Sequence, residues 1–467
     1  MSEIGTVVVW SVTGIVVVTI SAQLGLYFSA AVELNRIRKR DRHQLWRRML
    51  ATPLSPGLTV LVPAYNEAVT VVDSVSTLLA LTYPNLEVVV VNDGSSDATL
   101  DRLIDAFDLT PIGPAYRRVL DTAPVREIYR SPRDARLVVV DKHNGGKADS
   151  LNAAVNVASG ELVCAIDADT LVAVDALQQL ASPFLTDSNT VAVGGTIRLV
   201  NDAIRTDGQI VDVRAPRRLL VGAQVVEYTR SFLVGRIGWG PLGGNLIISG
   251  AFGLFQRAAL MEINGYAHDS VGEDMELIVR LRRTAYERGK VAKVEFSPEP
   301  VAFTEAPESL RTLARQRNRW FRGLLDVLVR HRRMILRPRY GSAGMLGLPY
   351  FVVVEALAPV LEIAGLATLL VVGIAGGLTA SMLIPVGLAY LAGMCASFFV
   401  LIVDDLAFGT FGSTRDRALI VGHVVFEHLV FRPMTLVWRI WGLILFLQGR
   451  SEWGVQERRG LEDLAAG

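Results

Sequence analysis

Two acidic residues, Asp167 and Asp169, directly follow a short apolar run at Leu162–Ile166. The run is typical of a buried strand, and side chains two positions apart on a strand share a face, so both carboxylates can point the same way. Two like charges held that close repel each other unless a cation lies with them. Few, hard oxygen ligands suit Mg²⁺ or Mn²⁺ together with substrate phosphates. A solvated acidic turn would explain this pair alone, so the neighbouring segments decide between the two interpretations.

A glycine pair and a lysine lie just upstream of the acid pair, in the stretch Asp141-Lys-His-Asn-Gly-Gly-Lys147. Glycines let backbone amides approach a phosphate closely, and Lys147 adds a point charge. From Ala148 onward the sequence is typical of a helix, whose N-terminus would face the same anion. The segment lacks the spacing of a P-loop, which excludes that class of nucleotide site.

Residues 141–170 together resemble the nucleotide-sugar and metal region of the family 2 glycosyltransferases, which are inverting enzymes with a GT-A fold. The resemblance implies a UDP-sugar donor and a Mg²⁺ or Mn²⁺ cofactor. It also implies that Asp167 and Asp169 hold the metal. We therefore expect the acid pair to be the metal site of a membrane glycosyltransferase rather than a solvated turn.

Two earlier loops resemble the donor-binding elements of the same family. Leu58–Val62 is a predicted strand that runs into Pro63-Ala-Tyr-Asn-Glu67, and Glu87–Val91 is a second strand that ends at Asn92-Asp93. Strands alternating with helices and acidic turns predict a nucleotide-binding α/β half. The predicted donor-binding residues are Ala64, Tyr65, Asn66, Glu67, Asp93, Lys142, Gly146, Lys147, Asp167 and Arg319.

The segment Gly272-Glu-Asp-Met-Glu276 opens a predicted helix. Acids in a first helical turn are favoured by the helix dipole, which explains them without any catalytic role. The resemblance implies more, because this family's Glu-Asp pair supplies the base. Glu273 and Asp274 match that pair, and Asp274 is the predicted base that takes the proton of the acceptor hydroxyl.

The acceptor side is predicted from two segments. Ser249 and Gly250 lie in a small, apolar segment that resembles the family's acceptor region, although a tight turn would explain it too. Leu310–Arg333 is a predicted helix with the Gln-x-x-Arg-Trp motif of processive members, here Gln316, Arg319 and Trp320. These side chains lie within about one helical turn and can share a face. An interfacial helix would also favour Arg and Trp, but it does not require Gln at that spacing.

The apolar residues, 51% of the chain, are concentrated at residues 4–32 and about 343–447. Each stretch is long enough to cross a bilayer, so we expect an integral membrane protein with a soluble middle part. Seven basic residues between Arg36 and Arg48 follow the first stretch and place the middle part in the cytoplasm by the positive-inside rule. No basic block indicates nucleic acid, and two cysteines cannot form a disulfide framework.

The C-terminal part offers two predicted spans, about 343–374 and 379–403, before a polar loop that includes Asp404 and Asp405. Glu355 and Glu362 share a helical face, where they could line a sugar channel or pair with neighbouring groups. Residues 418–447 fit one kinked span, a hairpin or a helix lying in the interface. The tail 451–458 loosely resembles the gating loop of hyaluronan and chitin synthases.

The predicted architecture is an α/β GT-A (Rossmann-like) cytoplasmic domain with an α-helical transmembrane region. Its predicted parts are a signal-anchor helix at 1–35, a basic linker at 36–57, the GT-A domain at 58–305, interfacial helices at 306–342, membrane or interfacial helices at 343–447, and a cytoplasmic tail at 448–467.

The resemblance implies inverting, processive transfer from a UDP-sugar to a growing β-linked polysaccharide. Export through the chain's own helices and export with accessory proteins are both compatible with the motifs. One rival is transfer of a single sugar to a lipid such as polyprenyl phosphate. A rival of another class is a transporter with an inactive transferase domain, which the complete set of motifs and the lack of a transporter-like repeat disfavour.

Overall fold

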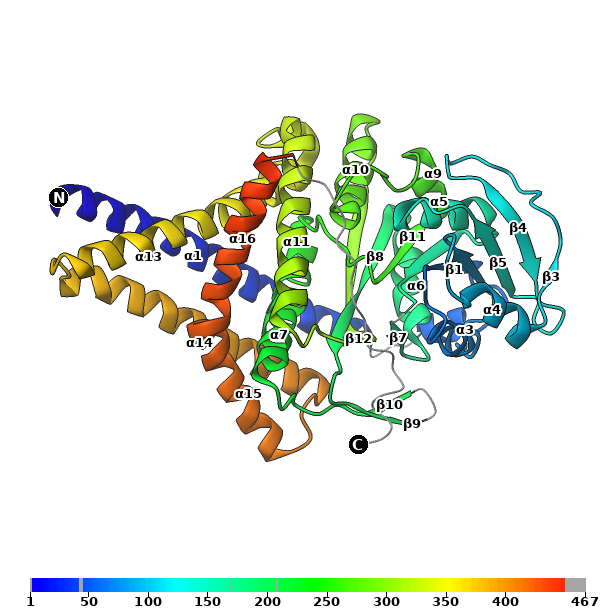
Figure 1. Cartoon of the computed structure of the whole chain (residues 1–467), viewed down its shortest axis with the longest axis horizontal. Coiled ribbons are helices and arrows are strands. Elements are labelled where there is room, and N and C mark those ends of the chain that lie inside the picture. Colours follow the sequence, from blue (N-terminus) through cyan, green and yellow to red (C-terminus); the bar gives the residue numbers. More distant parts are fainter. Residues whose placement is uncertain (1, 42–44, 169, 207–208, 450–467) are drawn as a thin grey trace.

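The computed structural model describes residues 2–41, 45–168, 170–206 and 209–449. It has a sheet covered by helices on both faces, from which a set of long helices projects along the longest axis (Figure 1). A layer of helices that includes α7 (Leu219–Thr229), α11 (Leu310–Arg330) and α16 (Arg432–Leu447) lies between these two parts.

The sheet is mixed and has the strand order β3-β4-β5-β2-β1-β6-β11-β8-β12-β7. Its central strands β5, β2, β1 and β6 are parallel, while β11 is antiparallel to both β6 and β8. The strands are β1 Leu58–Ala64, β2 Leu86–Asn92, β3 Thr110–Pro111, β4 Val125–Arg130, β5 Leu137–Lys142, β6 Leu162–Ile166, β7 Leu171–Val172, β8 Thr190–Leu199, β11 Phe252–Gln256 and β12 Lys293–Thr304. A separate two-stranded ribbon joins β9 (Ile204–Thr206) and β10 (Gln209–Asp212). The order reverses between β1 and β6, the kind of place where open α/β sheets bind ligands.

Alternation along the strands divides the core between the two faces of the sheet. On β1, Val60 and Val62 belong to one buried cluster and Leu61 to the other, as the two-residue period of a strand requires. One face is covered by α3 (Val71–Leu79), α4 (Thr99–Phe107) and α6 (Ala176–Thr186). The other face is covered by α5 (Lys147–Val157), α9 (Arg257–Glu262) and α10 (Glu273–Glu287).

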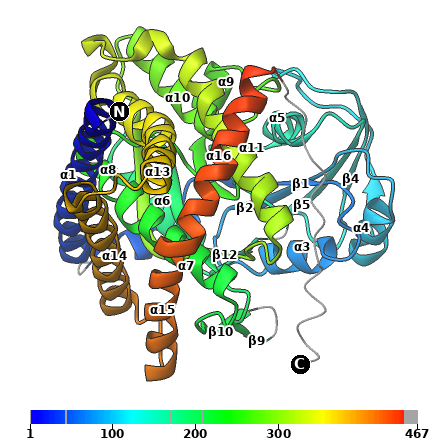
Figure 2. The same ribbon diagram turned by 60° about the vertical axis from the view of Figure 1, so that its left-hand side comes forward.

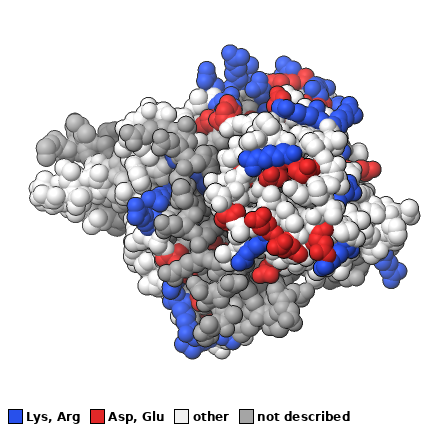
Figure 3. All heavy atoms as spheres, turned by 45° about the vertical axis from the view of Figure 1, so that its right-hand side comes forward, with Lys and Arg blue, Asp and Glu red and all other residues white. Residues whose placement is uncertain are grey.

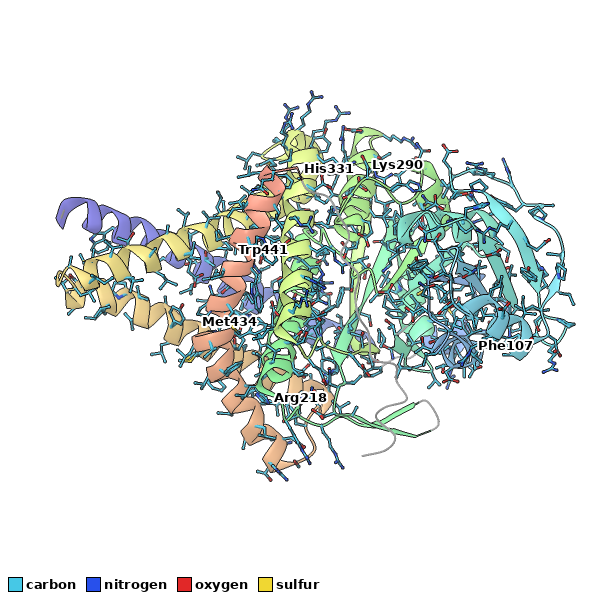
Figure 4. All side chains as sticks on the ribbon, viewed as in Figure 1. Phe107, Arg218, Lys290, His331, Met434 and Trp441 are labelled. Atoms are coloured by element: carbon cyan, nitrogen blue, oxygen red, sulfur yellow. The ribbon has the colours of Figure 1, made fainter. Side chains whose placement is uncertain are left out.

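The layer next to the sheet includes a helical segment that spans residues 219–236 in two parts. It begins as α7 and continues as a π-helical segment, η1 (Arg230–Arg236), before the short α8 (Trp239–Leu242). The predicted helix at 310–333 is α11, which ends at Arg330. Figure 4 shows α11 running between the ends marked by Arg218 and His331, with Met434 and Trp441 marking α16 alongside it.

Within the described part of the chain, four helices are long and apolar enough to cross a membrane: Val17–Ile37, Ala343–Ile374, Ala380–Phe408 and Thr414–Leu447. The first belongs to α1 (Ser2–Asp41), the second contains α13 (Ala358–Ile374), and the third is α14 (Ala380–Phe408). These three project together from the body (Figure 1), and their described surface carries few charged side chains in Figure 3. The four candidate spans agree with the membrane protein predicted from the apolar stretches.

The last of these helices runs continuously from Thr414 to Leu447 through α15 (Thr414–Phe426), a π-helical turn η6 (Glu427–Phe431) and α16. Of the forms that the sequence allowed, the hairpin is therefore wrong. The helix crosses the projecting helices instead of running with them (Figures 1 and 2). Pro433 closely follows the π-helical turn η6, and the helix continues through it.

The charged residues of this region are paired across helices. Glu362 accepts from Arg432 (2.9 Å), and Glu355 lies 3.4 Å from Arg439, so pairing with neighbours is the alternative that the structure shows. The prediction of a polar loop that includes Asp404 and Asp405 is wrong, because α14 continues to Phe408. Asp404 instead pairs with Arg198 of β8 (3.0 Å), and both side chains are largely buried. The residues of the predicted gating loop, 451–458, lie outside the described part of the chain.

Candidate active site

The loop after β1 and the loop after β2 bind each other at the carboxyl edge of the sheet. Asn66 adopts a left-handed backbone conformation (φ 55°), and its side-chain oxygen accepts from the backbone N–H of Ser96 (2.8 Å). The backbone N–H of Glu67 donates to Thr99 Oγ1 (2.9 Å). Tyr65 stays 53% exposed at the tip, whereas Ala64 is buried at the end of β1. The predicted donor-binding residues 64–67 thus form a rigid rim with one exposed ring.

Asp93 and Lys142 organise the glycine loop from inside the protein. The carboxylate of Asp93 accepts from the backbone N–H of Gly145 (2.9 Å) and of Gly146 (2.8 Å). Lys142, which is fully buried, lies 2.5 Å from Asp93 and 2.7 Å from Asp149. Both predicted donor-binding side chains therefore hold the loop that leads into α5.

Lys147 and Asp167 form an ion pair at the centre of this edge. The ammonium of Lys147 also donates to the carbonyl oxygen of Gly250 (3.0 Å), in the turn before β11. A Cβ at Gly250 would lie 3.5 Å from that ammonium and 3.6 Å from the Cβ of Asp274. The structure therefore brings together one donor-side lysine, one metal-pair aspartate and the acceptor-side glycine of the sequence prediction. Ser249 is adjacent to Gly250 in the same turn.

Glu273 and Asp274 begin α10 and face the same cation. Burial opposes the charge on Lys147, but Asp167, Glu273 and Asp274 together raise its pKa. Burial, and then the charge of Asp274, raises the pKa of Glu273 to about 7. The first helical turn therefore contains two neighbouring carboxylates whose charges repel each other, and the raised pKa of Glu273 is of a kind common at functional sites.

The predicted acceptor residues lie on α11. Trp320 is 43% exposed, and its ring makes a tilted contact with Tyr228 of α7, with ring centroids 6.3 Å apart. The guanidinium of Arg317 lies 4.3 Å from the centre of the Trp320 ring and pairs with Glu227 (2.5 Å). The side chains of Tyr228 and Arg317 thus contact the Trp320 ring, and the exposed part of the ring is available to a ligand.

The other two motif residues lie on the same helix. The charge of Arg319 acts on Glu273 and lowers its pKa, which opposes the effect of burial. The side-chain oxygen of Gln316 is buried and has no hydrogen-bond partner among the residues described. Since buried polar atoms are normally satisfied, this oxygen is a candidate for contact with a ligand.

The donor set fits a hard divalent cation. Asp169, one of the two predicted metal ligands, lies outside the described residues, and within the described ranges no three His, Cys, Asp or Glu side chains form a metal cluster. Asp167, Glu273 and Asp274 nevertheless act together on the single ammonium of Lys147. Carboxylate oxygens of this kind are ligands that suit Mg²⁺ or Mn²⁺.

Sequence reasoning missed three residues that the structure places at or behind the site: Asp149, Tyr228 and Arg236. Asp149 pairs with Lys142 across the glycine loop, and Tyr228 supports Trp320 from another helix. Arg236, at the end of η1, acts electrostatically on Asp274. Asp149 lies within the 141–170 stretch but was not singled out, and Tyr228 and Arg236 belong to no motif, so no spacing in the sequence indicated them.

Comparison with known proteins agrees with this geometry. The family described as "Glycosyl transferase family group 2" matches residues 162–407, more than half of the chain. The chain belongs to the family 2 glycosyltransferases. The family described as "Glycosyl transferase family 2" also matches residues 59–118, which include the first two loops of the site.

Two curated relatives of this family 2 glycosyltransferase are poly-beta-1,6-N-acetyl-D-glucosamine synthases. The synthase of Staphylococcus aureus (strain COL) is 29% identical over 277 residues, which is 59% of this chain and 56% of the relative. The synthase of Staphylococcus epidermidis is 28% identical over 274 residues. The match therefore spans little more than half the length of these curated relatives.

A solved structure with the same fold is a mannosyltransferase from Pyrobaculum calidifontis in complex with GDP-Man and Mn²⁺. It superposes with a TM-score of 0.55 at 18% identity, covering 94% of this chain and 100% of that chain. At this identity the likeness shows the fold alone. The predicted α/β GT-A fold is confirmed.

Proposed function

We propose that this glycosyltransferase transfers a sugar from a UDP-sugar to the end of a growing β-linked polysaccharide, with inversion, at the cytoplasmic face of the membrane. The observation that carries the proposal is the convergence of Lys147, Asp167 and the Glu273–Asp274 pair at one sheet edge. The exposed ring of Trp320 on α11 supplies the acceptor side. The basic residues after the first apolar stretch favour the cytoplasmic side.

On the donor side, the Asp93–Lys142–Asp149 network holds the glycine loop for the nucleotide diphosphate. Lys147 meets the phosphates, and the rim at residues 64–67 borders the nucleoside. Asp167 and Asp169 would hold the Mg²⁺ or Mn²⁺. The bound ion would neutralise charge on the departing diphosphate.

On the acceptor side, Asp274 accepts the proton of the attacking hydroxyl, a role that general-base geometry allows at the start of α10. Gln316, Arg319 and Trp320 orient the terminal sugar, and the turn at Ser249–Gly250 lets it approach closely. The printed names of the curated relatives favour N-acetylglucosamine as the transferred sugar and a polymer as the product.

The test is a transfer assay with the full chain purified in detergent. UDP-N-acetylglucosamine and other UDP-sugars are supplied with Mg²⁺ or Mn²⁺, and both UDP release and product length are measured. We expect metal-dependent UDP release and a long product from one donor. Asp274→Asn serves as the matched inactive protein and should lose about a hundred- to ten-thousandfold in rate.

Two outcomes contradict the proposal. Absence of turnover with every UDP-sugar would exclude it. A product with one added sugar on a polyprenyl phosphate would replace the polymerase by a single-sugar transferase.

A further inference from the structure

Arg236 is a partly buried cation with two buried hydrogen-bond donor atoms that have no partner among the described residues. It is the last residue of η1, and its guanidinium carbon lies 4.2 Å from the ring centre of Phe232 and 5.9 Å from that of Phe296. Its Nε and Nη1 atoms are buried and have no hydrogen-bond partner in the described ranges. Arg230, at the other end of the same segment, instead pairs with Glu427 at 2.9 Å.

An arrangement of this kind opposes folding. A guanidinium carries five N–H groups and cannot lose its charge under ordinary conditions, so burying two donor atoms without acceptors costs free energy. The faces of the guanidinium gain some attraction from the two aromatic rings, but rings do not satisfy in-plane N–H groups. A bound ligand with oxygen atoms would satisfy them.

Of the acidic residues at the site, Asp274 is the one whose charge acts on Arg236. Burial lowers the pKa of Arg236 to about 10, and only Asp274 and Tyr228 act against that effect. Lys147, in contrast, is acted on by Asp167, Glu273 and Asp274. The charge of Asp274 thus acts on both cations, whereas Asp167 and Glu273 act on Lys147.

Tyr228, the second group that acts on Arg236, connects Arg236 to the proposed acceptor side. Tyr228 makes tilted ring contacts with Trp320 (centroids 6.3 Å apart) and with Phe232 (5.7 Å), so one aromatic row connects the ring proposed for the acceptor sugar to the ring beneath Arg236. Arg236 is therefore linked to both acceptor-side groups, through Phe232 and Tyr228 to Trp320 and through its charge to Asp274. The terminal sugar of the acceptor must reach Asp274 if that carboxylate takes its proton.

We propose that Arg236 is an acceptor-binding residue that donates hydrogen bonds from Nε and Nη1 to a hydroxyl or acyl oxygen of the acceptor's terminal sugar. This assignment rests on the proposed function and names a residue outside its motifs. A neutral oxygen is favoured over a phosphate because the nearby charge of Asp274 repels an anion. Charge-assisted hydrogen bonds of this kind are stronger and more directional than neutral ones.

The test compares the full wild-type chain with Arg236→Met and Arg236→Lys in detergent. Binding of a short β-linked N-acetylglucosamine oligosaccharide is measured by calorimetry with UDP and Mn²⁺ present, so it does not depend on turnover. UDP affinity, hydrolysis of the donor by water and the melting temperature Tm are measured in parallel. Arg283→Gln, at an exposed ion pair on α10, is the matched control.

For Arg236→Met we expect oligosaccharide affinity to fall about 10- to 100-fold, as loss of hydrogen bonds to a charged group predicts. UDP affinity and donor hydrolysis should stay within about twofold. Tm should not fall, because the substitution removes an uncompensated buried charge. Arg236→Lys should recover only part of the affinity, since an ammonium lacks the planar fork of a guanidinium.

Three outcomes would overturn the assignment. A large fall in Tm would make Arg236 structural, and a fall in UDP affinity would move it to the donor side. Contact with an acceptor sugar would be excluded if Arg236→Met kept the wild-type oligosaccharide affinity, or if the wild type itself bound no oligosaccharide. In the second case, binding of polyprenyl phosphate that depends on Arg236 would assign a phosphate instead. Oligosaccharide binding without transfer by the wild type would contradict the proposed polymerase and leave the binding assignment standing.

Discussion

Gly272 and Gly323 meet backbone to backbone at the junction of α10 and α11. A Cβ on Gly323 would lie 2.9 Å from the Cα of Gly272, and a Cβ on Gly272 would lie 3.0 Å from the Cα of Gly323. Gly272 immediately precedes the Glu273–Asp274 pair, and Gly323 follows Trp320 by less than one helical turn. This contact sets the distance between the proposed base and the proposed acceptor platform.

The first prediction is that Gly323→Ala lowers sugar transfer by at least about tenfold while leaving UDP affinity nearly unchanged. The added methyl group meets backbone atoms, which cannot rotate away, so α11 must move relative to α10. A misplacement of about 1 Å at a reacting group can cost about a hundredfold in rate. The measurement is transfer rate together with UDP affinity by calorimetry.

Gly422→Ala is the control for this substitution. Gly422 lies in α15, and a Cβ there would have no atom within 4 Å. Alanine in an open helical position should stabilise the helix by up to about 1 kcal/mol. Equal transfer rates in Gly323→Ala and Gly422→Ala would show that the glycine contact does not position the site.

The sequence was informative where a local period or motif exists. The strand predicted at Leu162–Ile166 has those limits in the structure, and the predicted helix at 310–333 differs only at its C-terminal end. Two-residue alternation and apolar runs reflect which side chains of a strand are buried. The pattern can therefore be read from that strand's own residues. The family motifs then indicated which strand ends to examine.

The pairings between distant residues could not be predicted. Arg439 and Glu355 are 84 positions apart, and Arg198 and Asp404 are 206 positions apart. Either charge could have faced solvent, a channel or another partner, since a single sequence contains no information on which of these contacts forms. The π-helical segment at Arg230–Arg236 likewise has no local signal, yet it determines where Arg236 lies.

The second prediction concerns pH and the metal. Glu273 has a pKa raised to about 7, so its protonated form is favoured by folding. The resulting stability is fully present below the unfolded-state pKa of about 4.5 and is lost as pH rises through about 7, on the order of 2–3 kcal/mol. A divalent cation offsets that loss. The Tm increase caused by Mn²⁺ should therefore be larger at pH 8 than at pH 5.5.

Glu273→Gln separates this effect from general metal binding. The variant lacks the titrating group, so in metal-free solution its Tm should change less between pH 5.5 and pH 8 than that of the wild type. An identical pH dependence of Tm in both proteins would mean that Glu273 does not titrate in this range.

The third prediction concerns the buried lysine behind the glycine loop. Lys142→Met leaves the carboxylates of Asp93 and Asp149 buried without their cation, which should destabilise the chain by about 3–5 kcal/mol. Lys290→Met is the control, because Lys290 is exposed (Figure 4) and lies 3.8 Å from Glu262. The control should change stability by less than about 1 kcal/mol. Similar Tm values for the two variants would contradict the role of Lys142.

The fourth prediction concerns the ion pair that joins α13 to α16. Glu362→Gln and Arg432→Gln should each lower Tm, because each leaves a partner that lies largely out of water. The double variant should be less destabilised than the sum of the two single variants. The same cycle at the more exposed Arg417–Asp405 pair should give a coupling below about 1 kcal/mol. Additive effects at Glu362 and Arg432 would show that the pair does not link the helices.

The last prediction concerns Trp320 and product length. The exposed part of its ring is proposed to stack on the acceptor's terminal sugar, and ring stacking of this kind contributes about 1–3 kcal/mol by analogy with nucleobases. That range retains a chain between additions without preventing its advance. Trp320→Ala should therefore reduce elongation far more than UDP affinity, and the remaining products should be short. Donor hydrolysis by water should persist, because water needs no platform.

A membrane-anchor role for Trp320 makes different predictions. An amphipathic ring at the headgroup level would be replaced by Phe with little effect, and Trp320→Ala would lower protein yield while surviving enzyme made products of unchanged length. The tilted contact between Trp320 and Tyr228 gives a second comparison, because Tyr228→Leu removes a support of the Trp320 ring but leaves that ring itself. Under the acceptor role, Tyr228→Leu should shorten the product less than Trp320→Ala does. An unchanged length distribution from well-folded Trp320→Ala would end the processive interpretation of this motif and favour single-sugar transfer to a lipid.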